Sequence, residues 1–287
     1  MKFEKINLTH KALIYSALKE DNISWEYCFS CLYVWNKGRT YVYSDDKVAL
    51  FYMDFGKKYM FMPPFVFSKE DVDITTYIDK AYEYTKSKNA TFIMRGFDKG
   101  FAEEYKNRYS FVTKRNESDY IYNAQDLISL AGKKFHSKRN FVNRFASKYD
   151  YSFKEYESKD HDTVISLFDK WSLNKNDDLM NERDAIDRSL NYYVELELKI
   201  GLLFVKNELV GFSIVDPGKN GTAHYLFEKA SIEYEGAYQT INYLTCKTFL
   251  YNAKYINRQE DMGMEGLRKS KLSYYPTIIL DKYNIVK

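Results

Sequence analysis

Cysteine is scarce in this chain: Cys28, Cys31 and Cys246 stand alone among 287 residues. An odd number leaves one thiol without a partner, so no disulfide framework is indicated. Cys28 and Cys31 form a single C-x-x-C pair, with neither a second pair nor a histidine nearby, which is poor zinc-site spacing. Their neighbours in WEYCFSCLYVW are mostly apolar. We therefore expect a buried helical face in a protein of the reducing cytoplasm.

Long apolar runs and histidine clusters are also missing. No stretch reaches 18 apolar residues, so the sequence predicts no transmembrane segment. The first residues, MKFEKINLTHKALIY, lack the apolar centre of a signal peptide, and we expect a cytoplasmic protein. His136, His161 and His224 show no metal-ligand spacing, and the sequence has neither a P-loop nor a Ser-His-Asp order. We predict no metal site.

The formal charge is nearly balanced at +3, so any contact with nucleic acid must depend on a local cluster. One such cluster, KKFHSKRNFVNRFASK at residues 133–148, carries six cations and no acid. Its apolar residues Phe135, Val142 and Phe145 share one helical face. The helix could hold phosphates of a tRNA acceptor end or of a small phosphorylated or amine substrate. It could equally be a solvated helix between domains. The polar residues that bear on the first interpretation are Lys138, Arg139, Asn140 and Asn143.

Aromatic residues are abundant, with 28 tyrosines and 20 phenylalanines. Tyrosine combines an apolar ring with a polar tip, which suits both cores and binding surfaces. Lysine, asparagine and isoleucine are frequent as well, so we interpret the tyrosine count as a compositional bias.

The order of predicted elements repeats once along the chain. Each half shows helices, a strand meander, a crossover helix and further strands, which is the order of an acetyltransferase-like α/β domain. We therefore predict two tandem GNAT (acyl-CoA N-acyltransferase)-like domains with mixed central sheets flanked by helices, an α/β (α+β) fold. The expected division is an N-terminal domain at 1–132, the basic linking helix at 133–148 and a C-terminal domain at 149–287. The repeat is one of architecture, without residue-by-residue similarity.

A polar, glycine-containing stretch lies near the C-terminus, at Ile256–Pro276. It follows a short apolar strand and contains both charge signs beside Gly263 and Gly266, which allow a backbone to approach a ligand closely. Such a stretch is either a solvated strand–turn–helix connection or a binding site. Its place after a strand and crossover helix favours the edge of a site in the second domain.

Several segments together resemble the family named for the C-terminal domain of phosphatidylglycerol lysyltransferases, in its stand-alone branch. They are LAGKKFHSKRN at 130–140 with Asn143 and Phe145, FEKA at 227–230, GAYQ at 236–239 with Asn242, NRQEDMG at 257–263 and GLRKSK at 266–271. The linking helix is also similar to Fem-type transferases. The resemblance covers nearly the whole chain and implies a tandem GNAT-like fold and transfer of an aminoacyl group, with aminoacyl-tRNA as a possible donor, to an amine or hydroxyl.

The loop before the long predicted helix 236–252 bears on the donor. In acetyltransferases a Q/R-x-x-G-x-G/A loop holds the coenzyme A pyrophosphate with backbone N–H groups at a helix N-terminus. Here the glycine is Gly236, but Glu233 replaces the basic residue, Glu235 stands beside the loop, and Tyr238 takes the small final position. Carboxylates disfavour a pyrophosphate, so coenzyme A is the less expected donor.

The resulting hypothesis is an acyl- or aminoacyltransferase whose cleft is lined by residues 226–239 and 257–271. Glu228 and Asp261 are the candidate bases or ammonium anchors, and Arg268 is the candidate for stabilising the oxyanion. The alternatives are a non-catalytic ligand-binding GNAT-like module and an acetyl-CoA-dependent N-acetyltransferase. The residues predicted to bind substrate are Lys138, Arg139, Asn140, Asn143, Gly236, Gln239, Asn242, Asn257, Arg258 and Lys271.

Overall fold

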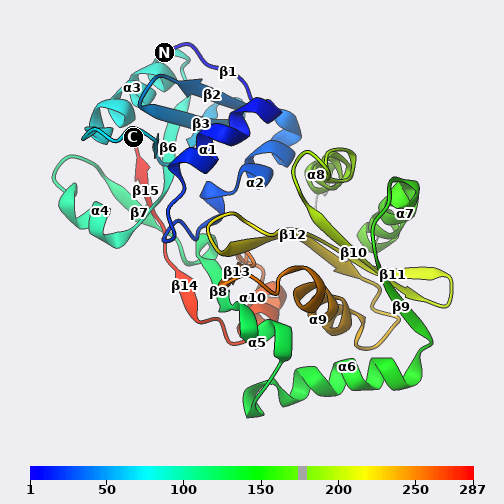
Figure 1. The fold of residues 1–287 in the computed structure, drawn as a ribbon. Coiled ribbons are helices and arrows are strands. Elements are labelled where there is room, and N and C mark those ends of the chain that lie inside the picture. The colour runs from blue at the N-terminus through cyan, green and yellow to red at the C-terminus, as the bar shows by residue number, and fades with distance from the viewer. Residues whose placement is uncertain (174–179) are drawn as a thin grey trace. The chain divides into compact units, whose positions relative to one another are not determined.

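The computed structural model describes residues 1–173 and 180–287. This part of the chain divides into two compact units (Figure 1). Unit 1 comprises Met1–Asp119, Glu260–Met264 and Ile279–Lys287, and unit 2 comprises Tyr120–Gln259 and Glu265–Ile278. These bounds differ from those of the predicted domains 1–132 and 149–287. Two C-terminal segments, Glu260–Met264 and Ile279–Lys287, belong to unit 1. The predicted linking helix is part of unit 2. The domain boundaries stay a prediction.

The sheet of unit 1 runs in the order β1–β2–β3–β4–β6–β15–β7, and β5 pairs with β3. The last strand, β15, was not predicted from the sequence. It lies between β6 and β7 and pairs with both. The bounds are β1 Glu4–Lys5, β2 Thr40–Ser44, β3 Val48–Asp54, β4 Lys58–Phe61, β5 Phe65–Val66, β6 Thr91–Phe97, β7 Phe111–Thr113 and β15 Tyr283–Val286.

Short helices connect these strands, and side-chain caps fix where they begin. Asp73 accepts a hydrogen bond from the N–H of Thr75 at 2.9 Å, and Asp98 accepts one from the N–H of Phe101 at 2.8 Å. Such caps satisfy N–H groups that a helix start leaves unpaired. The helices are α1 Lys11–Ala17, α2 Phe29–Val34, α3 Ile74–Ser87 and α4 Lys99–Glu104. The Cys28–Cys31 segment is buried, as predicted.

The sheet of unit 2 runs in the order β14–β8–β13–β12–β11–β10–β9. In Figure 1, α7 and α8 lie on one side of this sheet and α6 and α9 on the other. The strands are β8 Asp119–Asn123, β9 Tyr151–Glu155, β10 Lys199–Val205, β11 Glu208–Asp216, β12 Thr222–Ala230, β13 Tyr255–Asn257 and β14 Ile278–Leu280. The helices are α5 Ala124–Ser129, α6 His136–Lys148, α7 His161–Ser172, α8 Met180–Asn191, α9 Ala237–Phe249 and α10 Glu265–Leu272.

The basic segment 133–148 is helical, as its pattern predicts, and its apolar face is buried. Phe135 and Phe145 are both fully buried in the core of unit 2. Phe135 packs in a cluster with Tyr120, Tyr122 and Tyr225, while Phe145 packs with Ala237 and Ile241 of α9. The cations of α6 lie outside this face, so the helix is a packed element of unit 2.

Gly236 allows α6 and α9 to approach each other closely. Its φ of +91° is a conformation that L side chains rarely adopt, and an added Cβ would lie 2.7 Å from the Phe141 carbonyl oxygen. We expect Gly236→Ala to lower the free energy of unfolding by about 1–3 kcal/mol. Gly266→Ala is the matched control, since a Cβ there meets nothing within 4 Å. Urea denaturation of both variants measures the difference, and equal stabilities would contradict the assignment.

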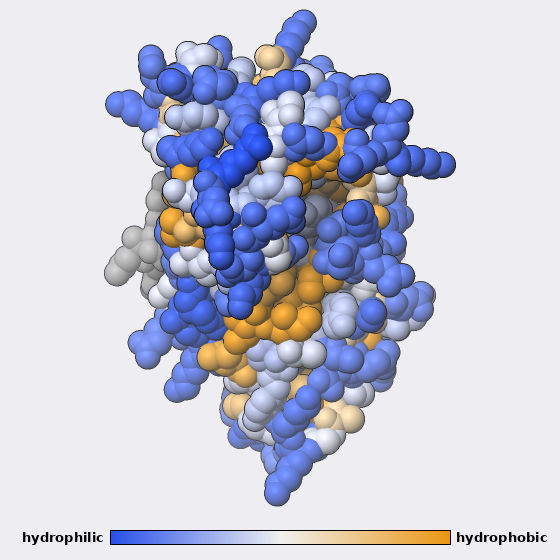
Figure 2. Space-filling view, turned by 90° about the vertical axis from the view of Figure 1, so that its left-hand side faces the viewer, coloured by the Kyte–Doolittle hydropathy of each residue, from blue (hydrophilic) through white to orange (hydrophobic). Residues whose placement is uncertain are grey.

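On the face shown in Figure 2, hydrophilic residues cover most of the area and apolar residues gather in patches. No helix among the described residues is long and apolar enough to cross a membrane.

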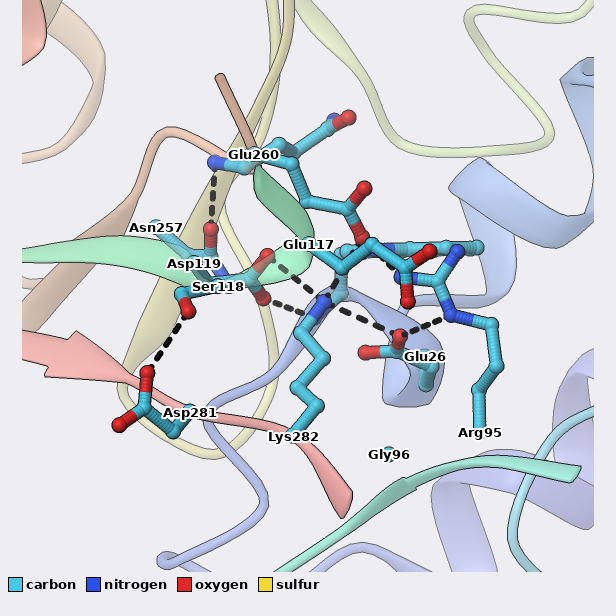
Figure 3. A network of polar contacts seen from close by, with 12 residues as sticks. Glu26, Arg95, Gly96, Glu117, Ser118, Asp119, Asn257, Glu260, Asp281 and Lys282 are labelled. Carbon is cyan, nitrogen blue, oxygen red and sulfur yellow. Dashed lines mark hydrogen bonds and ion pairs between the residues drawn. The ribbon is translucent and has the colours of Figure 1, made fainter. Parts of the chain in front are cut away.

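A buried cluster of charges ties the C-terminal segments into unit 1. Figure 3 shows Lys282 pointing between the carboxylates of Glu26, Asp119 and Glu260. Its Nζ lies 3.0 Å from Glu26 Oε1, 2.8 Å from Asp119 Oδ1 and 3.0 Å from Glu260 Oε1. Arg95 also pairs with Glu260, and its Nε lies 3.5 Å from Glu26 Oε1. Three carboxylates therefore share two cations inside the unit.

The neighbouring carboxylates Glu26 and Glu260 have opposite pKa shifts. Burial raises the pKa of Glu26, although Lys282 and Arg95 oppose the shift. Burial acts in the same direction on Glu260, but Lys282 and Arg95 outweigh it and lower the pKa of that group. The Glu26 contribution to stability is therefore complete below its unfolded pKa, near 4.5, and is lost as the pH rises through the folded value. The Glu260 contribution is present above its unfolded pKa and is lost as the pH falls.

Glutamine variants test these signs. We expect the stability of Glu26→Gln relative to the wild type to increase from pH 4 to pH 8, because the variant lacks the buried carboxyl that must ionise. For Glu260→Gln the relative stability should decrease over the same interval. Guanidinium denaturation at several pH values gives both curves. Parallel curves for the two variants would contradict the assignment.

Candidate functional site

The two parallel strands at the centre of unit 2 part before β12 ends. β12 and β13 pair at Thr222–His224 with Tyr255–Asn257. Beyond this ladder, Arg258 and Gln259 follow β8, since Arg258 N–H donates to the Tyr120 carbonyl at 3.0 Å. Glu228 lies farther along β12, past the last paired residue. Glu228 on β12 and Arg258 after β13 therefore lie beyond the point where the two strands stop pairing.

Glu228, Arg258 and Asn242 meet at this point. Arg258 Nη2 donates to Glu228 Oε1 at 2.8 Å, and Asn242 Nδ2, from α9, donates to Glu228 Oε2 at 2.8 Å. The side chains of Glu228 and Arg258 are 12% and 11% exposed, and Asn242 is fully buried. Both oxygens of the carboxylate are thus held by donors in a nearly solvent-free position. The sequence predicted all three residues as site residues.

Aromatic rings enclose the Arg258 guanidinium. It lies 5.1 Å from the ring centroid of Tyr274, 5.4 Å from that of Tyr225 and 6.0 Å from that of Tyr122. Burial alone would lower the pKa of Arg258, but the Glu228 carboxylate outweighs it and raises the pKa. The guanidinium therefore stays charged, and in this setting its field is weakly screened.

Two polar atoms of this group have no hydrogen-bond partner among the described residues. They are Arg258 Nη1, a donor, and Asn242 Oδ1, an acceptor, and both are buried. A buried polar group without a partner costs free energy, and such exceptions are rare in folded proteins. The site therefore offers one donor and one acceptor on either side of a carboxylate.

Lys138, on α6, is the second cation near the site. Its Nζ lies 4.2 Å from the Tyr274 ring centroid and donates to Ser273 Oγ at 2.6 Å. Burial, and after it the neighbouring Arg258 guanidinium, lower the pKa of Lys138. Lys138 forms no ion pair with a carboxylate among residues 1–173 and 180–287. Its surroundings thus favour the neutral amine more than those of an ordinary surface lysine.

Other predicted binding residues have structural contacts. Arg139 donates to the carbonyls of Leu130 and Gly132, the latter at 2.7 Å, and so caps the end of α5. Lys271 Nζ donates to the carbonyls of Arg258 and Gln259 at 2.6 and 3.1 Å and holds that turn. Asn257 Oδ1 accepts from the Gln259 N–H at 2.6 Å.

For the remaining predicted residues, the structure gives the following burial and contacts. Asn140 and Asn143 are exposed on α6, and Asn140 Nδ2 lies 3.1 Å from His136 Nε2. Gln239, in α9, is half-buried, as is Arg268 in α10. Asp261 belongs to unit 1, where it is fully buried, accepts from the Gly263 N–H at 2.8 Å and lies 3.6 Å from Arg115 Nη1. Roles for these residues stay predictions.

The loop before α9 carries two exposed carboxylates, Glu233 and Glu235. Glu235 lies 3.1 Å from Arg144 Nη1, but both side chains are more than half exposed, so this pair is weak. Glu233 is exposed. The Tyr238 hydroxyl accepts a hydrogen bond from Trp171 Nε1 at 2.8 Å, which holds the tyrosine side chain against α7.

Unit 1 repeats the strand geometry of the site. There β4 and β6 form the parallel ladder, which ends at Phe61 and Met94, and Arg95 follows directly. Arg258 follows the end of its own ladder in the same way. In unit 1, Lys282 shares the carboxylates with the arginine, whereas in unit 2 Glu228 pairs with Arg258 and an uncharged amide. The two units therefore surround the equivalent arginine with different groups.

The site residues predicted from the sequence did not include Tyr122, Tyr225, Tyr274 or Ser273. The abundance of tyrosine was interpreted as a compositional bias, yet the rings of Tyr122 and Tyr225 lie near the guanidinium of Arg258. Ser273 and Tyr274 lie within the Ile256–Pro276 stretch, two and three residues after the GLRKSK segment, and this proximity was the available signal. The described residues contain no group of His, Cys, Asp and Glu that could hold a metal ion.

Solved structures of other proteins share this fold. FemX superposes with a TM-score of 0.61 at 11% identity, over 100% of this chain and 98% of that chain. A tandem GNAT protein from the clavulanic acid biosynthesis pathway gives a TM-score of 0.56 at 10% identity, over 99% and 98%. At such identities the likeness establishes the fold alone. It confirms the predicted mixed α/β fold of the tandem GNAT type.

The chain belongs to the phosphatidylglycerol lysyltransferase C-terminal family, whose model matches residues 21–286. A conserved protein of unknown function from Bacteroides thetaiotaomicron is 29% identical, with a TM-score of 0.88 over 100% of this chain and 99% of that chain. The L-PGS of Bacillus licheniformis is 16% identical, with a TM-score of 0.69 over 99% and 92%. An uncharacterized protein of Mycoplasmoides gallisepticum is 25% identical over 186 residues, which are 63% of this chain and 60% of that protein. The family resemblance is thus confirmed.

Proposed function

We propose that the chain is an aminoacyltransferase, with aminoacyl-tRNA as donor and an amine or hydroxyl as acceptor. The observation that carries the proposal is the unpartnered pair beside Glu228, Arg258 Nη1 and Asn242 Oδ1. An aminoacyl ester presents an acceptor, its carbonyl oxygen, next to a donor, its α-ammonium. Arg258 can donate to the carbonyl oxygen, while Asn242 Oδ1 and the Glu228 carboxylate accept from the ammonium.

The same arrangement supports the chemistry of transfer. Attack on the ester carbonyl converts its oxygen to an oxyanion, which a fixed donor in a low-dielectric site stabilises. Arg258 stays charged and is held by Glu228 before any substrate arrives, so little reorganisation is needed. Asp261 and Arg268 are not part of this proposal, which rests on Glu228, Arg258 and Asn242.

The family membership and the charge of the loop before α9 support this donor over coenzyme A. The family is named for a lysyltransferase. Glu233 and Glu235 place two carboxylates where an acetyltransferase would bind a pyrophosphate. Lys133, in the basic segment just before α6, is exposed and available for the phosphates of an acceptor end.

The test uses donors that differ only at the α-amino group. Radiolabelled aminoacyl-tRNAs and their N-acetylated forms are incubated with the protein and hydroxylamine, a small amine acceptor, and the product is quantified. We expect the wild type to prefer the free α-ammonium. Glu228→Gln should lose this preference by about 10–100-fold, because a charge-assisted hydrogen bond contributes about 1.5–3 kcal/mol.

Glu233→Gln is the matched control, since it removes an exposed carboxylate of unit 2 and should leave the preference unchanged. Transfer from acetyl-CoA, with no reaction of any aminoacyl-tRNA, would establish the N-acetyltransferase instead. Tight binding of an aminoacyl donor without turnover would establish the binding module.

A further inference from the structure

The proposed site still needs a group that accepts a proton. Transfer to a neutral acceptor releases one proton for each new bond. Both oxygens of Glu228 already accept hydrogen bonds, from Arg258 and from Asn242. That carboxylate is therefore engaged as an anchor. Lys138 is a titratable group near the site that forms no ion pair among the described residues, and its Nζ contacts Ser273 Oγ at 2.6 Å.

We propose that Ser273 and Lys138 form a serine–lysine dyad, in which Ser273 Oγ takes the acyl group as a covalent intermediate before the acceptor does. The role proposed for this dyad rests on the aminoacyl transfer proposed above. Serine is a weak nucleophile until an adjacent base removes its proton, and serine–lysine pairs are a known variant of that arrangement. Ser273 is half-buried, and its hydroxyl donates a hydrogen bond to the Ser270 carbonyl at 2.6 Å, which fixes its rotamer.

The surroundings of Lys138 suit a base. The amine lies over the Tyr274 ring, and that ring also contacts the Arg258 guanidinium, so the two cations share one aromatic neighbour. Burial and the charge of Arg258 lower the pKa of Lys138, which increases the neutral fraction near pH 7. The same tyrosine therefore links the dyad to the residues proposed to hold the aminoacyl group.

The chemistry balances in two steps. In the first, Ser273 Oγ forms a bond to the ester carbonyl carbon, and the bond from that carbon to the ribose oxygen breaks. The serine proton passes to Lys138 and then to the ribose oxygen, which leaves as a hydroxyl. In the second, the acceptor attacks the seryl ester, and the proton that it loses passes through Lys138 to Ser273 Oγ as that bond breaks.

A fluorophosphonate probe tests the dyad independently of the acyl donor, since it labels activated serines without any aminoacyl-tRNA. We expect the wild type to be labelled at Ser273, as identified by peptide mass spectrometry, and Ser273→Ala to lose this label. Lys138→Met and Lys138→Arg should both slow labelling about 100-fold or more, because arginine keeps the charge but cannot accept the proton. Ser270→Ala removes an exposed hydroxyl three residues away and should be labelled as the wild type is.

Two outcomes would overturn the dyad: no label at Ser273, or labelling that Lys138→Arg leaves unchanged. Aminoacyl transfer by Ser273→Ala at the wild-type rate would also overturn it, while leaving the proposed function in place. Conversely, Lys138-dependent labelling of Ser273 in a protein that moves no aminoacyl group would establish the activated serine and remove the proposed function. Thermal unfolding of each variant confirms that the compared proteins are folded.

Discussion

Lys282→Met is expected to lower the free energy of unfolding by about 3–5 kcal/mol, because it leaves buried carboxylates without their cation. Lys282 is 1% exposed and contacts Glu26, Asp119 and Glu260. Methionine fills a similar volume, so the loss reports the charge and not a cavity. Burial acts to lower the pKa of Lys282, and the three carboxylates outweigh it and raise the pKa. The lysine is therefore charged throughout the neutral range.

Denaturant unfolding of the full chain measures the change. Lys106→Met is the control, since Lys106 pairs with Glu103 on the surface at 65% and 63% exposure. An exposed pair contributes about 0–1 kcal/mol. If both variants lost the same stability, Lys282 would not hold the C-terminal segment in unit 1 through its charge.

Arg258→Lys is expected to reduce kcat/KM for aminoacyl transfer by about 100–1,000-fold, the usual effect of removing a fixed oxyanion donor. Lysine keeps the positive charge but lacks the planar fork that reaches Glu228 with one nitrogen and the substrate with another. Steady-state transfer from aminoacyl-tRNA to hydroxylamine gives the value. The variant should fold, since Glu228 keeps a cationic partner.

Two comparisons make the Arg258 result specific. Arg108→Lys alters an exposed arginine of unit 1, paired with Asp79 at 2.6 Å, and should not change transfer. Arg258→Met alone should destabilise unit 2, because it leaves Glu228 buried and unpaired, and Glu228→Gln with Arg258→Met should recover much of that loss. Full activity of Arg258→Lys would refute the assignment of the guanidinium to the reaction.

Local patterns in the sequence were enough to predict much of the fold. The helical face of residues 133–148 and the central strand 223–230 depend on periodicity and β-rich composition, and both are present as α6 and β12. The repeated outline also has a physical counterpart, since Arg95 and Arg258 each follow the end of a parallel ladder. The residues around Arg95 and Arg258 are not similar in sequence, so the equivalence of the two arginines could not be predicted.

Contacts between distant segments could not be predicted in this way. β15 joins the sheet of unit 1 although it ends the chain, and a strand of four residues gives little signal of its partner. Asp261 stands three residues after Arg258, yet the two belong to different units, because the chain leaves unit 2 after Gln259. Tyr122 and Tyr274 lie far apart in sequence, yet both lie near the guanidinium of Arg258.

The central claim is that the group around Glu228 recognises an aminoacyl ester. A stable analogue, 3′-deoxy-3′-(lysylamino)adenosine, carries the α-ammonium and carbonyl but cannot transfer, so calorimetric titration isolates recognition from catalysis. The account predicts saturable binding to the wild type and to Glu233→Gln, with at least about 10-fold weaker binding to Arg258→Lys and Glu228→Gln, corresponding to the loss of one charge-assisted hydrogen bond. Equal affinity across all four proteins, or binding of acetyl-CoA with none of the analogue, would contradict it.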